Sequence, residues 1–189
     1  MMERPEALKL LSKHRTDELV ITTMTVAGEW PLISNNDPLD FNMRESAMGR
    51  APSIGLGVAL AQPDRKVWVL NGDGSQLMNL GSLGSIGNAG VGNLIVFVFQ
   101  NDSYEVTGGQ PIPLAGRVDF TMVAKGLGVR NSYSFDEISD LEAKLPAILK
   151  EAGPTLVVLH VVSGNAPVAP RPDRVEEARK FQRALEVVG

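Results

Sequence analysis

The sequence predicts an α/β protein in which a parallel sheet carries helices on both faces, in three layers. Segments with helical and strand-like patterns alternate along the chain, as they do in proteins built around a parallel sheet. Two of the strand-like segments, 66–71 and 93–100, are short and almost continuously apolar. Such runs are typical of strands that are buried on both faces of a sheet.

The elements follow in a regular order. In the first half of the chain we expect a helix at 5–11, a strand at 19–25, a helix of small residues at 46–61, a strand at 66–71, a helix at 76–89 and a strand at 93–100. In the second half we expect a short helix at 120–127, a short strand at 129–132, a helix at 136–151 and a last buried strand at 155–162. An extended, proline-rich connector at 167–172 then leads to a terminal helix at 174–187 with a polar face.

Composition narrows the class of protein. With 189 residues, 43% hydrophobic content and a net charge of −4, we expect one globular domain over 1–189. The absence of cysteine excludes disulfides, iron–sulfur clusters and thiol catalysis. We find no signal peptide in 1–15 and no apolar run of membrane-spanning length, so we expect a soluble cytoplasmic protein. The acidic balance argues against nucleic acid as a partner.

Polar groups follow two successive strands of the predicted sheet. Asp73 lies just after the strand at 66–71, and Asn101 follows the strand at 93–100. If these strands are parallel neighbours, they lie about 4.8 Å apart with their carboxyl ends at the same edge of the sheet. Both side chains then face one cation. A carboxylate and an amide oxygen suit Mg²⁺, held at about 2.0–2.1 Å, with further positions left for diphosphate oxygens and water.

Glycines flank the carboxylate of this predicted metal site. Gly72 and Gly74 have no Cβ, so the turn is able to bring its backbone N–H groups close to an anion at the start of the next helix. A lone Gly-Asp-Gly also makes ordinary turns, and it is the spaced Asn101 that favours a metal–diphosphate site.

This pattern resembles the thiamine diphosphate (ThDP) enzymes, whose motif is GDG, roughly two dozen residues and then NN. Asn101 falls where that family has its metal-ligating Asn, although Gln100 replaces the first Asn of the pair. Ser103 falls where a backbone carbonyl completes the coordination. The resemblance therefore implies ThDP and Mg²⁺ as cofactors, with Asp73, Asn101 and Ser103 as metal ligands.

The residues before the glycine turn extend the resemblance. The segments 46–61 and 63–67 look like the corresponding part of ThDP-dependent 2-oxoacid decarboxylases, in particular sulfopyruvate and phosphonopyruvate decarboxylases. A ThDP-binding fold is thus implied. Met48 matches the apolar residue that supports the bent cofactor, and Ser46 the residue whose carbonyl meets the 4'-amino group. The alternative for Met48 is a core methionine.

A polar loop after Asn101 resembles the "Y…TGGQP" segment of the same decarboxylases. We expect this loop, 103–111, to close as a lid, with a simple surface turn as the alternative. At the end of the first strand, Thr23 and Thr25 are plausible diphosphate ligands or simply good strand residues. The complete set of expected cofactor-binding residues is Thr23, Thr25, Ser46, Met48, Gly72, Asp73, Gly74, Ser75, Asn101, Ser103 and Tyr104.

The resemblance also implies what this chain lacks. In such enzymes a glutamate bonded to the pyrimidine N1' lies in a separate pyrimidine-binding domain, and this chain has room only for the diphosphate-binding domain. We therefore expect the β subunit of a two-subunit decarboxylase, a carbon–carbon lyase active only with a pyrimidine-binding α subunit, in a homo- or hetero-oligomer. Its catalytic Glu is expected on the partner chain.

The implied substrate is a small 2-oxoacid with a second anionic group, such as 3-sulfopyruvate, and Arg117 is a weak candidate to bind that group. Two alternatives stay open. One is the β subunit of a 2-oxoacid:ferredoxin oxidoreductase, against which the absence of cysteine counts. The other is a non-catalytic, cofactor-binding regulatory subunit.

Overall fold

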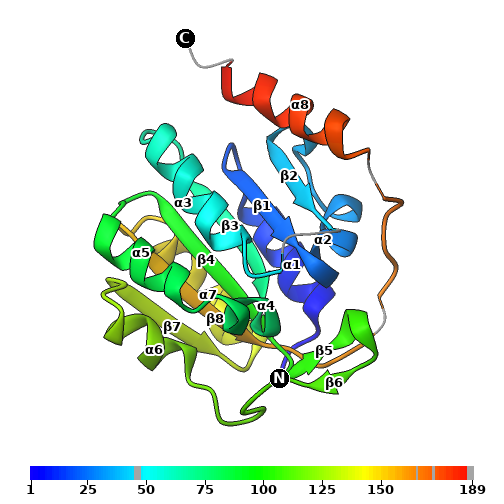
Figure 1. Cartoon of the computed structure of the whole chain (residues 1–189), viewed down its shortest axis with the longest axis vertical. Helices are drawn as coiled ribbons and strands as arrows, with labels where there is room; N and C mark the ends of the chain where they lie inside the picture. The colour runs from blue at the N-terminus through cyan, green and yellow to red at the C-terminus, as the bar shows by residue number, and fades with distance from the viewer. Residues whose placement is uncertain (45–47, 165, 172, 187–189) are drawn as a thin grey trace.

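The computed structural model describes residues 1–44, 48–164, 166–171 and 173–186. Its main sheet has six strands in the order β2-β1-β3-β4-β8-β7, and each neighbouring pair is parallel (Figure 1). The strands are β1 (Leu19–Thr23), β2 (Asp40–Met43), β3 (Val67–Gly72), β4 (Leu94–Gln100), β7 (Asn131–Phe135) and β8 (Thr155–His160). The predicted α/β class is confirmed.

Helices cover both faces of this sheet because successive strand side chains point to opposite faces and both sets are apolar. In β3, Trp68 and Leu70 join one core cluster, whereas Val67 and Val69 join the other. The first cluster lies under α1 (Arg4–His14), α2 (Met24–Glu29) and α7 (Ile138–Ile148). The second lies under α3 (Ala51–Ala61), α5 (Gly81–Ala89), α6 (Phe120–Gly126) and α8 (Arg174–Glu186). These are the three predicted layers.

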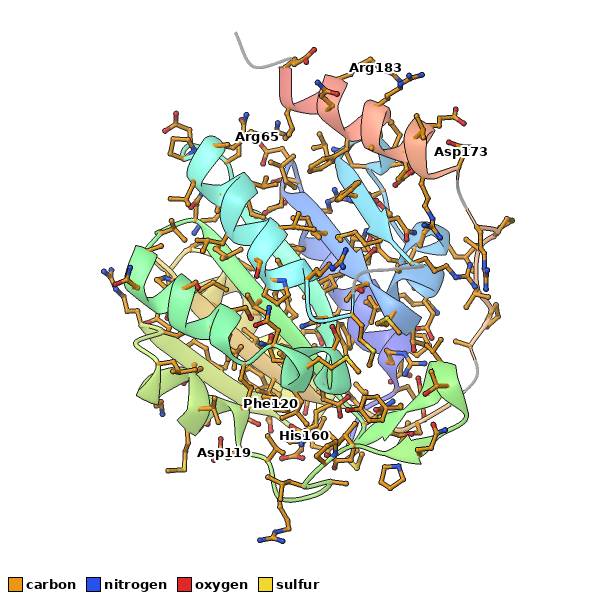
Figure 2. All side chains as sticks on the ribbon, in the orientation of Figure 1. Arg65, Asp119, Phe120, His160, Asp173 and Arg183 are labelled. Atoms are coloured by element: carbon orange, nitrogen blue, oxygen red, sulfur yellow. The ribbon has the colours of Figure 1, made fainter. Side chains whose placement is uncertain are left out.

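The terminal helix α8 closes one edge of the molecule, over β2 (Figure 1). Phe181 stacks on Phe41 of β2 with ring centroids 5.3 Å apart. Arg65, which is labelled in Figure 2, lies just before β3 and donates a hydrogen bond to the carbonyl of Ala184. The helix therefore packs on this chain through its apolar side. Among the described residues, no helix is both long and apolar enough to cross a membrane.

Several element boundaries differ from the prediction near the sheet's carboxyl edge. The strand expected at 19–25 ends at Thr23, because Met24 adopts a left-handed conformation (φ 56°) and α2 begins there. Thr25 is thus helical. The helix expected at 76–89 is two helices, α4 (Asp73–Met78) and α5, interrupted at Asn79, whose backbone is not helical (φ −146°).

Two further differences lie at the edges of the sheet. Strand β2, at one edge, was not predicted, because it is only four residues long, although its polar and apolar residues alternate as in a strand. At the other edge β7 occupies 131–135 rather than 129–132, and the Asn131 side chain fixes its start by donating to the Ala152 carbonyl. The helix expected from 46 begins at Ala51, and residues 45–47 lie outside the described part of the chain.

The remaining described elements are short. After β4 the chain forms a small antiparallel hairpin of β5 (Ser103–Tyr104) and β6 (Gln110–Pro111), joined by the 3-10 turn η3 (Glu105–Thr107). Two more 3-10 turns, η1 (Trp30–Leu32) and η2 (Asp37–Leu39), precede β2. The hairpin occupies the segment predicted to be a lid, and it stands at the carboxyl end of the sheet (Figure 1).

Candidate functional site

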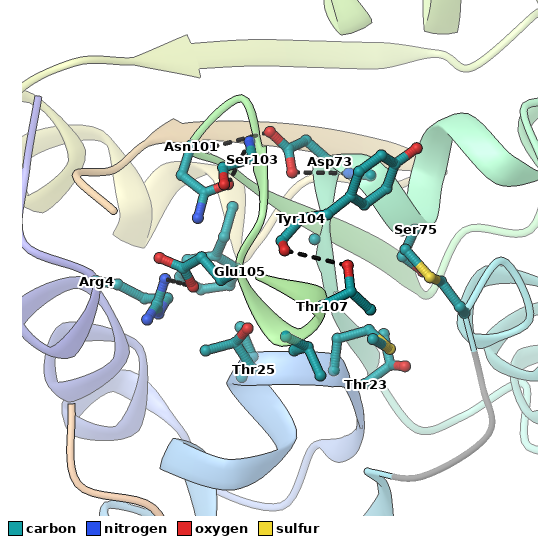
Figure 3. A pocket seen from close by; sticks show the side chains of 17 residues that line it. Arg4, Thr23, Thr25, Asp73, Ser75, Asn101, Ser103, Tyr104, Glu105 and Thr107 are labelled. Carbon is teal, nitrogen blue, oxygen red and sulfur yellow. Dashed lines mark hydrogen bonds and ion pairs between the residues drawn. The ribbon is translucent and has the colours of Figure 1, made fainter. Parts of the chain in front are cut away.

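A pocket opens at the carboxyl ends of β1, β3 and β4, which are adjacent in the sheet. It encloses about 470 Å³ of empty space, its open mouth included. Every expected cofactor-binding residue that the structure describes lines it: Thr23, Thr25, Met48, Gly72, Asp73, Gly74, Ser75, Asn101, Ser103 and Tyr104. The expectation for Ser46 falls outside the described residues. Figure 3 shows Asp73, Asn101 and Ser103 on one side of the pocket, with Thr23 and Thr25 across from them.

Asp73 is the polar centre of this pocket. It follows β3 and begins α4, and it is only 2% exposed. One carboxylate oxygen accepts the Gly74 N–H at 2.7 Å, and the other accepts the N–H groups of Asn101 and Asp102 at 3.0 and 2.6 Å. The carboxylate therefore joins the ends of β3 and β4, as the predicted strand pairing requires.

Burial raises the pKa of Asp73 to about 6, although its three backbone hydrogen bonds lower it, and the nearby charge of Asp102 raises it further. A buried carboxylate with a raised pKa lacks a compensating positive charge, and a bound cation would supply one. Among the described residues, no group of three or more His, Cys, Asp or Glu side chains is arranged to hold a metal. A cation here would instead need amide and carbonyl oxygens as well.

Those oxygens lie in the turn after β4. The side-chain oxygen of Asn101 accepts the Ser103 N–H at 3.1 Å. Between them Asp102 is left-handed (φ 59°), a conformation that Asp tolerates better than most residues. Asn101 and Ser103 thus lie in one turn of chain, and the hydrogen bonds from this turn to the Asp73 carboxylate bring the third predicted ligand beside them. Hard oxygen donors of this kind fit Mg²⁺.

The glycine turn is held by contacts that the sequence did not reveal. A Cβ on Gly74 would lie 2.4 Å from Cε1 of Tyr104, so the ring leaves room only for glycine. The Gly74 N–H is donated to the Asp73 carboxylate at 2.7 Å. A Cβ on Gly72 would meet no atom within 4 Å, and the space beside it is open.

Ser75 links this turn to the segment that carries Met48. Its hydroxyl accepts the Gly49 N–H at 2.9 Å, and the Asn79 side chain donates to the Gly49 carbonyl at 2.9 Å. Gly49 is left-handed (φ 77°), which turns the chain sharply at this point. Ser75 therefore positions the Met48–Gly49 turn against α4, and Met48 lies half-buried in the pocket wall.

Thr23 carries the clearest unsatisfied polar atom of the pocket. Its hydroxyl is fully buried and has no hydrogen-bond partner among the described residues. Unpaired buried hydroxyls are costly, and a bound polar ligand would satisfy this one. Thr25 reaches the same pocket from the first turn of α2 rather than from a strand.

Sequence reasoning missed three charged residues at this site. Arg4 and Glu105 line the pocket, and Glu29 lies behind Arg4. Arg4 donates to Glu29 at 2.7 Å. It also donates to Glu105 at 2.8 Å, the contact drawn in Figure 3. No local pattern could reveal these pairs, which join residues 25 and 101 positions apart. Arg117, the candidate for substrate binding, is exposed and is not among the residues that line the pocket.

The fold and the pocket together define an α/β domain with a polar site at the carboxyl edge of a parallel sheet. Residues 23–159 match the family model "Thiamine pyrophosphate enzyme, C-terminal TPP binding domain", thiamine pyrophosphate being another name for ThDP. The match spans most of the chain, and the chain belongs to this family. The predicted resemblance to ThDP enzymes is confirmed.

Individual relatives sharpen the comparison. The chain is 38% identical over 176 residues to phosphonopyruvate decarboxylase of Streptomyces viridochromogenes. The aligned region covers 92% of this chain and 44% of that enzyme. It is 38% identical over 168 residues to sulfopyruvate decarboxylase subunit beta of Methanothermobacter thermautotrophicus, covering 89% of this chain and 86% of that subunit. The chain thus spans less than half of the first relative and nearly all of the second.

A solved structure agrees with the fold. A Mycobacterium smegmatis protein described as thiamin diphosphate-dependent superposes with a TM-score of 0.71 at 21% identity, over 86% of this chain and 32% of that one. At this level of identity the likeness concerns the fold, and it matches the layered sheet of Figure 1.

Proposed function

We propose that this chain is the diphosphate-binding subunit of a ThDP- and Mg²⁺-dependent decarboxylase of a small anionic 2-oxoacid. The observation that carries the proposal is the meeting of Asp73 and Asn101 at the carboxyl edge of the sheet, in a chain of the ThDP-binding family. The similarity to decarboxylases of phosphonopyruvate and sulfopyruvate supports this substrate class.

In this proposal Asp73, the Asn101 side chain and the Ser103 carbonyl hold Mg²⁺, which binds the cofactor diphosphate. The bound cofactor supplies the electron sink for loss of CO₂. Thr23 donates its unpaired hydroxyl to the diphosphate, and Met48 supports the cofactor from the pocket wall. The 103–111 hairpin excludes water, which strengthens electrostatic interactions inside the pocket.

The chain needs a partner for the rest of the chemistry. Glu105, the glutamate among the pocket-lining residues, is engaged by Arg4 and by the Gly164 N–H. We therefore assign the glutamate that acts on the pyrimidine to a pyrimidine-binding α subunit. The name "subunit beta" of a similar protein supports this division, and we expect a hetero-oligomer in the cytoplasm.

The partner also has to recognise the second anionic group of the substrate. Among the described pocket-lining residues the one cation is Arg4, and Glu29 and Glu105 both balance its charge. This leaves no net positive side-chain charge for a dianionic substrate among the described residues that line this pocket. Another ThDP reaction and a regulatory role are the alternatives, and the activity of the assembled complex separates them.

The test is co-expression with the partner, followed by measurement of CO₂ release over a panel of 2-oxoacids. We expect activity from the complex and none from this chain alone, which should elute from gel filtration as a dimer or larger species. Decarboxylation by the pure chain at about 1 s⁻¹ or faster, a rate typical of enzymes, would refute the two-subunit proposal. A complex that binds ThDP but releases no CO₂ from any 2-oxoacid would favour the alternatives.

A further inference from the structure

A buried ion network stands beside the pocket. Arg4, the first residue of α1, is 3% exposed, and its Nε and Nη2 donate to Glu29, the last residue of α2, at 2.7 to 3.0 Å. Glu29 is 2% exposed. The two side chains form a forked pair, which neutralises the charge of Arg4 within the protein interior.

Glu105 adds a second carboxylate to the same guanidinium. One of its oxygens accepts Nη1 of Arg4 at 2.8 Å, and the other accepts the Gly164 N–H at 2.9 Å. Arg4 also donates to the Gly164 carbonyl at 3.0 Å. Four segments distant in sequence therefore meet at Arg4: the start of α1, the end of α2, the hairpin and the chain after β8.

The position of Glu105 in the chain gives this network a consequence for the pocket. Glu105 comes two residues after Ser103 and begins η3. The segment 101–105 is held at one end by Asp73, through the Asn101 and Asp102 N–H groups, and at the other end by Arg4, through Glu105. Each residue has only two soft backbone torsions. Holding both ends of so short a segment therefore restricts the direction in which the Ser103 carbonyl points.

The two halves of the network differ in burial. The Glu29 side chain is 2% exposed and that of Glu105 is 15% exposed. Removing Glu105 leaves the forked Arg4–Glu29 pair complete, so no buried charge loses its partner. Removing Arg4 would instead leave Glu29 buried and unpaired, which is strongly destabilising. The contribution of Glu105 to the pocket is therefore separable from the stability of the fold.

We propose that Arg4 is a positioning residue of the cofactor site: it holds, through Glu105, the backbone segment that presents Asn101 and Ser103 to the metal and diphosphate. The inference rests on the proposed function, since it takes ThDP and Mg²⁺ as the occupants. Arg4 itself touches neither occupant. It acts by restraining the hairpin before the cofactor arrives, so that less ordering is needed on binding.

The test uses the full chain co-expressed with its partner. Glu105→Gln keeps an acceptor for the Gly164 N–H but turns an amide toward Arg4, and Glu105→Ala removes both contacts. With Mg²⁺ saturating, calorimetry should show ThDP affinity about tenfold weaker in both variants. A loss of this size is typical when a residue that orients the metal ligands, without binding the metal itself, is removed. Amide hydrogen exchange of 101–109, measured without cofactor, should become faster, while the melting temperature changes little.

Two controls separate positioning from general loosening. Gln110→Ala removes two side-chain hydrogen bonds with Thr107 within the same hairpin, and Glu142→Gln removes an exposed ion pair with Lys13. Both should leave ThDP affinity within about twofold, because the side-chain contacts that they remove end at Thr107 and Lys13, while the backbone pairing of Gln110 with Tyr104 is kept. If Gln110→Ala weakens affinity as much as Glu105→Gln, the stiffness of the hairpin matters and the link to Arg4 does not.

A double-mutant cycle tests whether Arg4 acts through Glu105. Arg4→Lys keeps a positive charge for Glu29 but loses the fork. Its affinity loss should not add to that of Glu105→Gln, whereas full additivity, or unchanged affinity and exchange in the Glu105 variants, would overturn the inference. If the wild-type complex fails to bind ThDP, the proposed function is wrong, and the hydrogen-exchange comparison alone still decides whether Arg4 restrains the segment.

Discussion

Asp40 and Asp73 are buried to a similar depth at opposite edges of the sheet, with exposed fractions of 4% and 2%. Asp40 begins β2 at the amino edge, where Arg15 lies 2.7 Å from its carboxylate and the Ser34 hydroxyl donates to it. Asp73 follows β3 at the carboxyl edge, and its hydrogen bonds come from backbone N–H groups. Burial raises the pKa of both carboxyls, and Arg15 offsets part of that rise for Asp40.

The difference between the two edges shows where this fold leaves room for a ligand. At the amino edge the chain supplies its own cation, Arg15, for the buried carboxylate. At the carboxyl edge the Asp73 carboxylate is buried at a similar cost, but it lies beside an open pocket. The hydrogen-bond partners of Asp73 include no cationic side chain. A buried charge without compensation is costly to keep for stability alone, and such groups concentrate at functional sites.

The largest effect that would test this comparison is expected from Asp73→Ala. Without the carboxylate the site loses its charged Mg²⁺ ligand, and without the cation the negative charge of the diphosphate is not neutralised. ThDP binding measured with Mg²⁺ by calorimetry should therefore fall by about a hundredfold or more. The isosteric changes Asp73→Asn and Asp40→Asn form a matched pair that compares the two ends of the sheet directly. Asp73→Asn should lose affinity with a small change in stability.

Asp40→Asn should do the reverse, because Arg15 would be left buried beside a neutral partner. We expect a loss of about 3 kcal/mol in the free energy of unfolding, measured by urea denaturation. The folded variant should bind ThDP as the wild type does. Equal loss of ThDP affinity in the two Asn variants would remove the distinction between the edges.

A smaller effect is expected from Gly74→Ala. Its Cβ would lie 2.4 Å from the Tyr104 ring, so the ring and the hairpin must shift, and overpacking of this kind costs about 1–3 kcal/mol. If about 1.4 kcal/mol of this cost is incurred by displacing the residues that bind the cofactor, ThDP affinity should fall about tenfold. In a Tyr104→Ala background the same change should cost less affinity, since the clash is gone.

Gly72→Ala is the matched control for this prediction. Gly72 has an extended backbone (φ −91°, ψ 156°), and an added methyl group would meet only open space, so the fold should tolerate alanine. Any loss of ThDP affinity in Gly72→Ala would therefore come from contact between the added methyl group and the cofactor, and it would show how closely the cofactor approaches the backbone of Gly72. Full affinity in Gly74→Ala would show that Tyr104 moves freely and does not shape the pocket.

Much of this site could be predicted because its information is local. The end of a strand and the turn after it are adjacent in sequence, so Asp73 and Asn101 could be placed at one edge once β3 and β4 were predicted as parallel neighbours. Alternation of helices and buried strands likewise gave the layers. Thr25 was placed on a strand because nothing in its residue type reveals the left-handed Met24 that ends β1.

The parts that could not be predicted depend on contacts between distant segments. Arg4 looks like any charged residue at the start of a helix, and its partners Glu29 and Glu105 follow no periodic spacing. The break between α4 and α5 is similar: the glycines after Asn79 reduce helix propensity, but only the packed chain shows where the helix stops. Tertiary contacts decide such positions.

The smallest predicted effect concerns pH. Because the folded-state pKa of Asp73 is raised from 3.8 to about 6, this group favours the cofactor-free fold fully below pH 3.8, and that contribution is lost as the pH rises through about 6. A bound cation reverses the balance, since it needs the ionised form and competes with the proton. Affinity for Mg²⁺ and ThDP should therefore weaken by about twofold from pH 7 to pH 6, and more steeply below.

Two measurements check this. Carbon-detected NMR should show the Asp73 carboxyl titrating near pH 6 without Mg²⁺, and calorimetry should follow ThDP affinity over the same range. The diphosphate itself takes up a proton in this range. The Asp73→Asn variant has no carboxyl to protonate at this position, so the pH dependence of its ThDP affinity measures the contribution of the diphosphate alone. If the pH dependence of the variant equals that of the wild type, the proton on Asp73 does not compete with the cation, and the contrast with Asp40 is structural without being functional.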